Sequence, residues 1–281
     1  MITVLNPGIY STIQDLGRSG FAHIGVPVSG VMDSYAAKIG NQLLHNNLDE
    51  AVIEITFGGC KFLFEENLEI CITGANFTPT IDGKEMQMNS VLEIEKGAVL
   101  SFGKKTFGIR TYLCIKGGIS SEVVLKSKSF YKGITANFVL KKGDQFKINS
   151  ITSENKRTLS KIKIDEEYFK ANTIECCKGS EFELLPKQQQ EKLLQGKYTI
   201  SNDNNRVGYR LEESFENQLK PILTSGVLPG TVQLTPSGKI IVLMKDCQVT
   251  GGYPRVLQLT ENALNILAQK STKDKLQFRL K

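Results

Sequence analysis

The sequence contains no tryptophan, two histidines (His23 and His45) and six cysteines, none of them in a Cys-x-x-Cys pair. Protein zinc sites use histidine and cysteine ligands at short spacing, and no His-Glu-x-x-His motif is present. We therefore expect no metal site. Cys60, Cys71 and Cys114 lie in or beside apolar segments, which predicts buried thiols in a reducing compartment.

Long apolar runs and dense basic clusters are also missing. The apolar runs reach about five residues, against the ~20 that a membrane-spanning helix needs. No signal-peptide pattern opens the chain, so we expect a cytoplasmic protein with no membrane anchor. The net charge of +6 comes from lysines spread along the chain without interleaved aromatic residues, which argues against nucleic-acid binding.

Three widespread motifs of nucleotide sites and hydrolases are absent. There is no Gly-x-x-x-x-Gly-Lys-Ser/Thr phosphate loop, no Gly-x-Gly-x-x-Gly turn and no Gly-x-Ser-x-Gly elbow. P-loop, dinucleotide-binding and α/β-hydrolase sites are therefore excluded, and any ATP site would be of another kind.

Two polar stretches are rich in glycine. Residues 14–33 read QDLGRSGFAHIGVPVSGVMD, and residues 225–254 read SGVLPGTVQLTPSGKIIVLMKDCQVTGGYP. Glycine lets backbone N–H groups approach a ligand closely, and loops on a rigid β scaffold commonly carry binding residues. The alternative is that both stretches are ordinary hairpin turns.

Similar features recur in the same order in the two halves of the chain. An Arg-x-Gly-aromatic unit occurs at 18–21 and 206–209, and Ser-Gly-Val occurs at 29–31 and 225–227. Each half then has an apolar strand pattern followed by Gly-Gly, and closes on an acidic residue before a last apolar strand. This shared order indicates an internal duplication.

Short strands separated by turns dominate the predicted secondary structure. Asp82-Gly83 predicts a tight hairpin, and strands are expected up to residue 115 and again at 173–177, 181–184, 198–201, 231–234, 240–244 and 276–280. Asp33 and Thr260 are expected to cap helices over 34–44 and 261–268, and Pro186 to begin a helix that Gly196 ends. We therefore predict a mainly β chain with a few helices, arranged as a barrel or sandwich.

The polar, lysine-rich segment 150–163 is the predicted domain junction. It separates an N-terminal module over residues 1–155 from a C-terminal module over residues 156–281.

Polar residues within the glycine-rich regions form three groups. They are Gln14, Asp15 and Arg18; Asn205, Arg206, Tyr209 and Arg210; and Gln233, Asp246, Gln248, Thr250 and Tyr253. Arginine offers a rigid fork for carboxylate or phosphate, aspartate can act as a base, and glutamine can hydrogen-bond an amide or lactam. Such a set suits amide chemistry or carboxyl transfer, in which an oxyanion needs preorganised donors. The alternative is that each aspartate pairs with an arginine only to brace a loop.

These motifs, with GIRTYLCIKGG (108–118) and NRVGYRL (205–211), resemble the KipA family. It is also called the 5-oxoprolinase C-subunit family, or the biotin-dependent carboxyltransferase (allophanate hydrolase subunit 2) family. The resemblance extends over residues 3–278 and implies two cyclophilin-like β-barrel modules from an internal duplication. It also implies a subunit of an ATP-dependent hydrolase complex that opens 5-oxo-L-proline to L-glutamate. The implied partners are two further proteins of this complex, one KipI-like and one LamB/YcsF-like.

The matched motifs suggest roles for the polar residues. Arg18 and Arg206 would hold phosphate or the substrate carboxylate. Asp15, Asp246 and Gln248 would orient the reacting amide as catalytic residues. The other substrate-binding positions are expected at Gln14, Tyr209, Gln233, Thr250 and Tyr253. The chain departs from the family where residues 127–130 read Ser-Lys-Ser-Phe in place of Ser-Arg-Ser-Thr, so a hydroxyl role at the last position is lost.

Two other functions remain open at this point. Fused relatives serve as the carboxyltransferase part of urea carboxylase, so one alternative is a biotin-dependent transfer to urea or a similar amide. The other is a non-catalytic protein that binds a KipI-like regulator.

Overall fold

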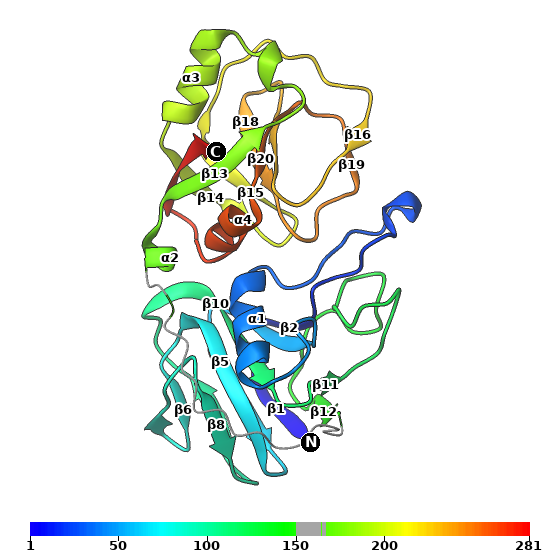
Figure 1. Cartoon of the computed structure of the whole chain (residues 1–281), viewed down its shortest axis with the longest axis vertical. Helices are drawn as coiled ribbons and strands as arrows, with labels where there is room; N and C mark the ends of the chain where they lie inside the picture. The colour runs from blue at the N-terminus through cyan, green and yellow to red at the C-terminus, as the bar shows by residue number, and fades with distance from the viewer. Residues whose placement is uncertain (150–163, 165–166) are drawn as a thin grey trace. The chain divides into compact units, whose positions relative to one another are not determined.

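The computed structural model describes residues 1–149, 164 and 167–281, and the chain divides into two compact units (Figure 1). Unit 1 comprises residues 1–18 and 33–166, and unit 2 comprises residues 19–32 and 167–281. The predicted modules were contiguous, whereas this division assigns the segment 19–32 to the second unit. The predicted junction at 150–163 lies outside the described residues.

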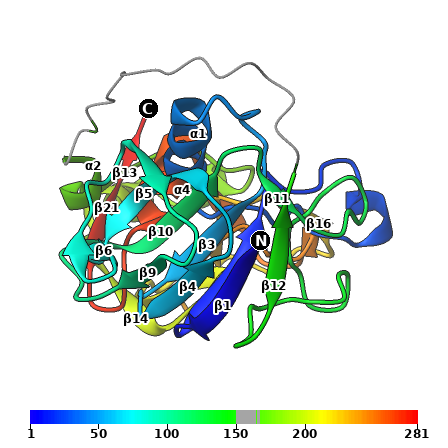
Figure 2. The ribbon, with the colours of Figure 1, turned by 90° about the horizontal axis from the view of Figure 1, so that it is seen from below.

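Unit 1 contains a seven-stranded sheet and a five-stranded sheet that share one apolar core. Their strand orders are β11-β12-β1-β4-β9-β6-β7 and β2-β3-β10-β5-β8 (Figure 2). The strands are β1 (Ile2–Pro7), β2 (Tyr10–Gln14), β3 (Val52–Thr56), β4 (Cys60–Phe64), β5 (Leu68–Asn76), β6 (Pro79–Ile81), β7 (Lys84–Glu85), β8 (Val91–Ile94), β9 (Val99–Phe102), β10 (Phe107–Ile115), β11 (Ile119–Ser120) and β12 (Gln145–Ile148).

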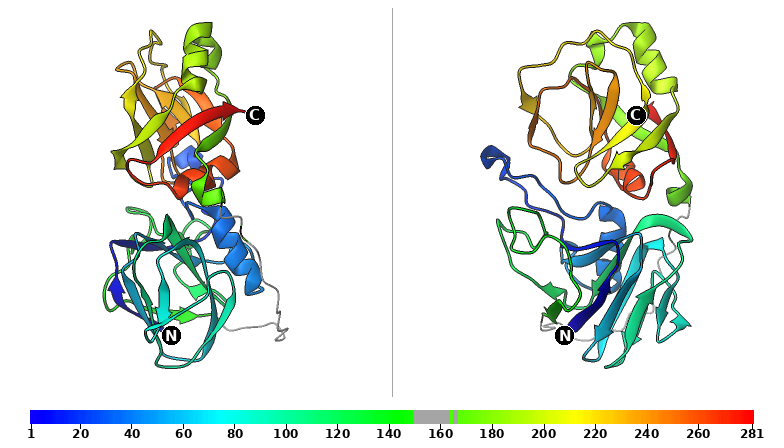
Figure 3. Two further views of the ribbon diagram at one scale, coloured as in Figure 1. Left: turned by 90° about the vertical axis from the view of Figure 1, so that its left-hand side faces the viewer. Right: turned by 180° about the vertical axis from the view of Figure 1, so that it is seen from behind.

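Helix α1 (Ser34–Leu43) packs on β5 and β10, the central strands of the five-stranded sheet (Figure 3). It begins where predicted because the Asp33 carboxylate accepts a hydrogen bond from the Ala36 amide, at 3.0 Å. The predicted hairpin also forms between β6 and β7. Asp82 and Gly83 both have positive φ, 48° and 83°, as a type I′ turn requires.

Unit 2 is a closed seven-stranded barrel with the order β13-β20-β17-β18-β15-β14-β21. Its strands are β13 (Thr173–Lys178), β14 (Tyr198–Asn204), β15 (Gly208–Ser214), β17 (Thr231–Leu234), β18 (Lys239–Leu243), β20 (Arg255–Leu259) and β21 (Lys275–Leu280). A separate pair, β16 (Ser225–Gly226) with β19 (Thr250–Gly251), lies at one side of the barrel (Figures 1 and 3). The helical segments are η1 (Ala22–Ile24), α2 (Glu167–Lys170), η2 (Phe182–Leu184), α3 (Lys187–Gln195) and α4 (Glu261–Ala268).

Strand alternation divides the barrel into an interior and an outer face. Tyr209 and Leu211 of β15 belong to the buried core, as do Val232 of β17 and Val242 of β18. Because successive side chains of a strand point to opposite faces, the residues between them, such as Arg210, point outward. The outer face of β17, β18 and β15 is therefore available to carry a site.

The mainly β character with few helices is confirmed, and one of the two units is a closed barrel. Thr260 caps α4 through a 3.2 Å bond from the Ala263 amide, as predicted. The strand predicted at 181–184 is wrong, since Phe182–Leu184 forms a 3-10 turn. No strand was predicted at β15 or β20, whose polar residues obscure the pattern.

Cys60, Cys71 and Cys114 are buried free thiols, as predicted. Within the described ranges, no helix is long and apolar enough to cross a bilayer. Those same ranges hold no group of three His, Cys, Asp or Glu side chains placed to bind a metal ion.

Candidate functional site

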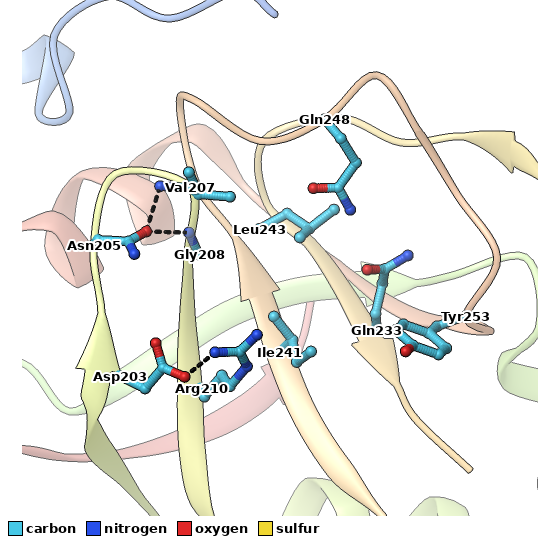
Figure 4. Close-up of a pocket in the computed structure, with 10 residues that line it drawn as sticks. All are labelled: Asp203, Asn205, Val207, Gly208, Arg210, Gln233, Ile241, Leu243, Gln248 and Tyr253. Atoms are coloured by element: carbon cyan, nitrogen blue, oxygen red, sulfur yellow. Dashed lines mark hydrogen bonds and ion pairs between the residues drawn. The ribbon is translucent and has the colours of Figure 1, made fainter. Parts of the chain in front are cut away.

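A cavity of about 180 Å³ lies on the outer face of the barrel in unit 2 (Figure 4). It is small beside the roughly 300–1,000 Å³ of clefts that take drug-sized ligands, so its size suits a small metabolite. The lining residues come from β14, β15, β17, β18, the turn after β14 and the loop after β18. They are Asp203, Asn205, Val207, Gly208, Arg210, Gln233, Ile241, Leu243, Gln248 and Tyr253.

The floor of this cavity is set by strand register. Ile241 of β18 is the Cα partner of Arg210 on one side and of Gln233 on the other. These three side chains therefore form a row across three neighbouring strands, on the face opposite to the core. The row places an arginine, an aliphatic side chain and an amide side by side.

Gln233 is the most unusual residue of the site. It is only 1% exposed, yet its Nε2 atom has no hydrogen-bond partner among the described residues. A buried amide without a partner costs about 1–3 kcal/mol, so such groups are rare in folded proteins unless they have a role. In Figure 4 the amides of Gln233 and Gln248 point into the same space. Gln233 Nε2 is therefore a buried hydrogen-bond donor without a partner among the described residues.

The main chain of β19 covers Gln233. A Cβ atom added to Gly251 would lie 2.6 Å from Gln233 Nε2, so any other residue at this position would require the amide to move. Glycine at 251 therefore allows the backbone to approach the amide, the use of glycine expected from the sequence of this loop.

Arg255 connects β16 to the barrel, and β16 pairs with β19 in the loop after β18. This arginine donates to both carboxylate oxygens of Glu181, at 2.9 Å from Nε and 2.7 Å from Nη2. Its Nη1 donates to Ser225 Oγ at 2.7 Å, which ties β16 to the barrel. The hydrogen bond from Arg255 lowers the pKa of the Glu181 carboxyl. Gln248 and Tyr253 lie in the same loop as β19, on either side of its pairing with β16.

The opposite wall carries Asn205 and an ion pair. Asn205 Oδ1 accepts hydrogen bonds from the backbone amides of Val207 and Gly208, at 2.8 and 3.2 Å, so its NH₂ group remains as a donor. Arg210 pairs with Asp203 through Nη1, and the two side chains are 50% and 59% exposed. The cavity therefore offers amide, phenol and guanidinium donors, which suit a ligand rich in carbonyl or carboxylate oxygens.

Arg206 and Asp246 lie outside this cavity and form an ion pair of their own. Arg206 Nε donates to Asp246 Oδ2 at 2.8 Å, and the side chains are 7% and 11% exposed. Ser29 Oγ donates to Asp246 Oδ1 at 2.7 Å, and Arg206 Nη2 donates to the Gly30 carbonyl at 2.6 Å. The pair therefore fastens residues 19–32 to the barrel, in line with the alternative that these residues brace loops.

Tyr209 and Thr250 also lie apart from the cavity lining. Tyr209 is fully buried in the barrel core, with its hydroxyl 3.4 Å from the Lys270 carbonyl. It is one residue out of phase with Arg210, so strand alternation turns it inward. Thr250 is exposed at the first position of β19.

Gln14, Asp15 and Arg18 belong to unit 1 and contact residues 127–130. The Asp15 carboxylate accepts four hydrogen bonds, from Gly17 N, Ser127 Oγ, Lys128 N and Ser129 Oγ, at 2.6–2.8 Å. The Arg18 side chain, 1% exposed, donates to the Ser129 carbonyl. Gln14 Nε2 donates to the Phe130 carbonyl at 3.2 Å. These contacts hold residues 14–18 against the Ser-Lys-Ser-Phe segment.

The structure thus brings together Gln233, Gln248 and Tyr253 with Asn205 and Arg210. Sequence reasoning missed the remaining lining residues: Asp203, Val207, Gly208, Ile241 and Leu243. The alternation Tyr209–Arg210–Leu211 was the available signal, since it marks β15 as a strand with an outward arginine.

Cys247 lies beside the cavity with Val227 and Leu243. Burial raises the pKa of its thiol to about 12, so it is protonated at neutral pH and is a poor nucleophile.

Three comparisons with known proteins relate to this geometry. The 5-oxoprolinase C-subunit of Escherichia coli (strain K12) is 31% identical over 276 residues, which is 96% of this chain and 87% of that protein. The 5-oxoprolinase C-subunit of Haemophilus influenzae is 30% identical with the same coverage. The solved structure of K. lactis urea amidolyase matches with a TM-score of 0.85 at 26% identity, over 99% of this chain and 18% of the amidolyase chain.

The resemblance identified from the sequence is confirmed by these relatives. A family model described as carboxyltransferase domain, subdomain A and B, matches residues 24–280. Since this match spans nearly the whole chain, the protein belongs to the family of carboxyltransferase domains with subdomains A and B.

Proposed function

We propose that this chain is the C-subunit of an ATP-dependent 5-oxoprolinase complex, which opens 5-oxo-L-proline to L-glutamate. Its partners are a KipI-like protein and a LamB/YcsF-like protein, which form the rest of the complex. The two C-subunit relatives support this assignment because the chain spans 87% of each of them.

The observation that carries the proposal within the structure is the partnerless Nε2 of buried Gln233. An amide N–H donor in a small cavity matches the carbonyl oxygen of a lactam in size and polarity. Binding that oxygen compensates Gln233 for its burial, and Gln248 and Tyr253 add contacts from the facing loop. These three residues are the proposed substrate contacts.

The chemistry requires an activated lactam. ATP supplies a phosphoryl group to the lactam oxygen, and ADP leaves. A first water attacks the ring carbon, and the C–N bond breaks as the nitrogen takes up a proton, which leaves an acyl phosphate. A second water hydrolyses the acyl phosphate to the new carboxylate of glutamate and free phosphate. In this scheme Gln233 orients the lactam carbonyl. The cavity of about 180 Å³ is small for a nucleotide, so ATP is assigned to the complex and not to this pocket.

The other residues singled out in the sequence receive a supporting role in this proposal. Arg206 with Asp246, and Asp15 with Arg18, hold the two glycine-rich stretches in place. Their substitution should reduce activity through loss of loop structure.

The test is reconstitution. This chain is mixed with the candidate KipI-like and LamB/YcsF-like partners, 5-oxoproline and ATP, and glutamate and ADP are measured with each component left out in turn. Glutamate formation should require this chain. In the same assay Gln233→Met should abolish or strongly reduce it, whereas Gln258→Met, a glutamine on the neighbouring strand β20, should retain it. Glutamate formation without this chain contradicts the proposal.

A second candidate is biotin-dependent carboxyl transfer to urea or a similar amide. It is favoured by the family description and by the fold match to urea amidolyase. Here the same amide donors would hold the acceptor amide while carboxybiotin supplies the carboxyl group. Transfer of labelled carboxyl from carboxybiotin to urea, in the absence of any ATP-dependent glutamate formation, would select this function.

A further inference from the structure

We infer that Arg210 is the specificity-determining residue of the outer-face cavity, and that it selects small amides bearing a carboxylate over neutral amides such as urea. That the ligand is a lactam rests on the proposed function. That it carries a carboxylate is inferred from the cavity itself.

The charge of the lining favours a ligand with a carboxylate. Among the lining residues, Arg210 is the one cation and Asp203 the one anion. The Asp203 carboxylate accepts a hydrogen bond from Arg210, and this ion pair offsets the repulsion that Asp203 would exert on an incoming anion. All other polar side chains of the lining can donate hydrogen bonds. A ligand with acceptor oxygens at both ends satisfies this set.

The ion pair of Arg210 leaves its guanidinium able to bind a ligand. The pair uses Nη1 and both partners are about half exposed, so it contributes little stability and can exchange one carboxylate for another. The planar guanidinium has further N–H groups that suit bidentate contact with a second carboxylate. In Figure 4 Ile241 lies between the Arg210 guanidinium and Gln233.

The spacing of Arg210 and Gln233 suits a small ligand that bridges them. The two residues are two strands apart in register, which is about 9.5 Å at the usual interstrand distance. Both side chains line the same cavity, so a five-membered lactam with a carboxylate on the ring carbon next to nitrogen can present its two acceptor groups to them. Ile241 between the two polar residues provides an apolar surface for the ring CH₂ groups.

The experiment measures ligand binding to the full chain by calorimetry or saturation-transfer NMR. The probes are 5-oxo-L-proline, 2-pyrrolidinone (the same lactam without the carboxylate) and urea. The variants are Arg210→Gln and the matched control Arg279→Gln. Arg279 is also an arginine of the barrel in an exposed ion pair, with Glu175, but it does not line the cavity.

The wild-type chain should bind 5-oxoproline more tightly than 2-pyrrolidinone, and urea least. Arg210→Gln should weaken 5-oxoproline binding by about tenfold or more, the worth of a charge-assisted hydrogen bond, and leave 2-pyrrolidinone binding unchanged. Arg279→Gln should bind all three as the wild type does. In the reconstituted complex, Arg210→Gln should raise KM for 5-oxoproline far more than it lowers kcat.

Two results overturn the inference. One is unchanged 5-oxoproline binding by a folded Arg210→Gln chain, and the other is no preference of the wild type for the carboxylated lactam. Either result is distinguishable from failure of the proposed function. A complex that makes glutamate with unchanged KM in Arg210→Gln retains the function and contradicts the inference. Selective binding of the carboxylated lactam without glutamate formation supports the inference and contradicts the proposed function.

Discussion

Replacing Gln233 with methionine should make the chain more stable and at the same time remove its ligand binding. The amide is 1% exposed and its Nε2 has no partner among the described residues, so folding strips it of water without compensation. That loss amounts to about 1–3 kcal/mol. Methionine has a similar length and volume but needs no hydrogen bond. The free energy of unfolding should therefore rise by an amount within this range.

The matched control is Gln258→Met on the neighbouring strand. Gln258 Nε2 donates to the Pro229 carbonyl at 2.9 Å, and its Oε1 accepts from Thr231 Oγ1 at 2.8 Å. Methionine at 258 would leave the Pro229 carbonyl and the Thr231 hydroxyl without their hydrogen-bond partner, so the free energy of unfolding should fall by about 1–3 kcal/mol. The same chemical change should thus have opposite signs at two positions of one barrel.

Scanning calorimetry and urea unfolding of the two variants provide the measurement. A change of 1 kcal/mol corresponds to roughly 2–4 °C in Tm for a chain of this size. Equal destabilisation by both substitutions would refute the reasoning, because it would mean that Gln233 is satisfied in the folded protein. A stabilised Gln233→Met chain that still binds 5-oxoproline would refute the assigned role of the amide.

Three further outcomes are expected. Arg206→Met should lower the free energy of unfolding by about 3–5 kcal/mol in urea melts, because it leaves a buried carboxylate unpaired, whereas Arg210→Met should cost less than ~1 kcal/mol. Maleimide labelling at neutral pH, read by mass spectrometry, should modify exposed Cys177 and spare Cys247 until the chain is unfolded. Because the pKa of Glu181 is lowered in the folded state, its carboxylate stabilises the fold fully above about pH 4.3, and this contribution is lost as the pH falls through the folded-state pKa. Glu181→Gln should therefore lower the free energy of unfolding at pH 7 and have little effect in acid.

Local features of the fold could be predicted from the sequence because they depend on neighbouring residues. The caps at Asp33 and Thr260 and the turn at Asp82-Gly83 each involve atoms within three residues of one another. Strand β15 could not be predicted from the sequence, because Glu212 and Glu213 interrupt its apolar alternation. Its conformation is decided only by closure of the barrel.

The candidate site shows the same limit. Gln233, Gln248 and Tyr253 could be named from the composition of their loop, and the structure places all three on the cavity. Arg206 lies in the turn before β15 and pairs with Asp246, whereas Arg210 of β15 reaches the cavity because it alternates with the buried Tyr209 and Leu211. The row from Arg210 to Gln233 depends on register between strands far apart in sequence, which no local pattern encodes.

The fastening of residues 19–32 by Arg206 and Asp246 bears on how the chain matures during synthesis. The ribosome synthesises residues 19–32, here called the arm, before any strand of the barrel that the arm joins. At ~5–20 residues per second, the interval between synthesis of the arm and of the barrel is on the order of ten seconds. During that time the barrel residues that the arm contacts have not yet been synthesised, while most of the residues of unit 1 are already emerging. Gly30 can be bound only after Arg206 has left the exit tunnel, and Ser29 only after Asp246 has done so. A gene fragment that begins at residue 156 would therefore yield a barrel that never acquires its arm.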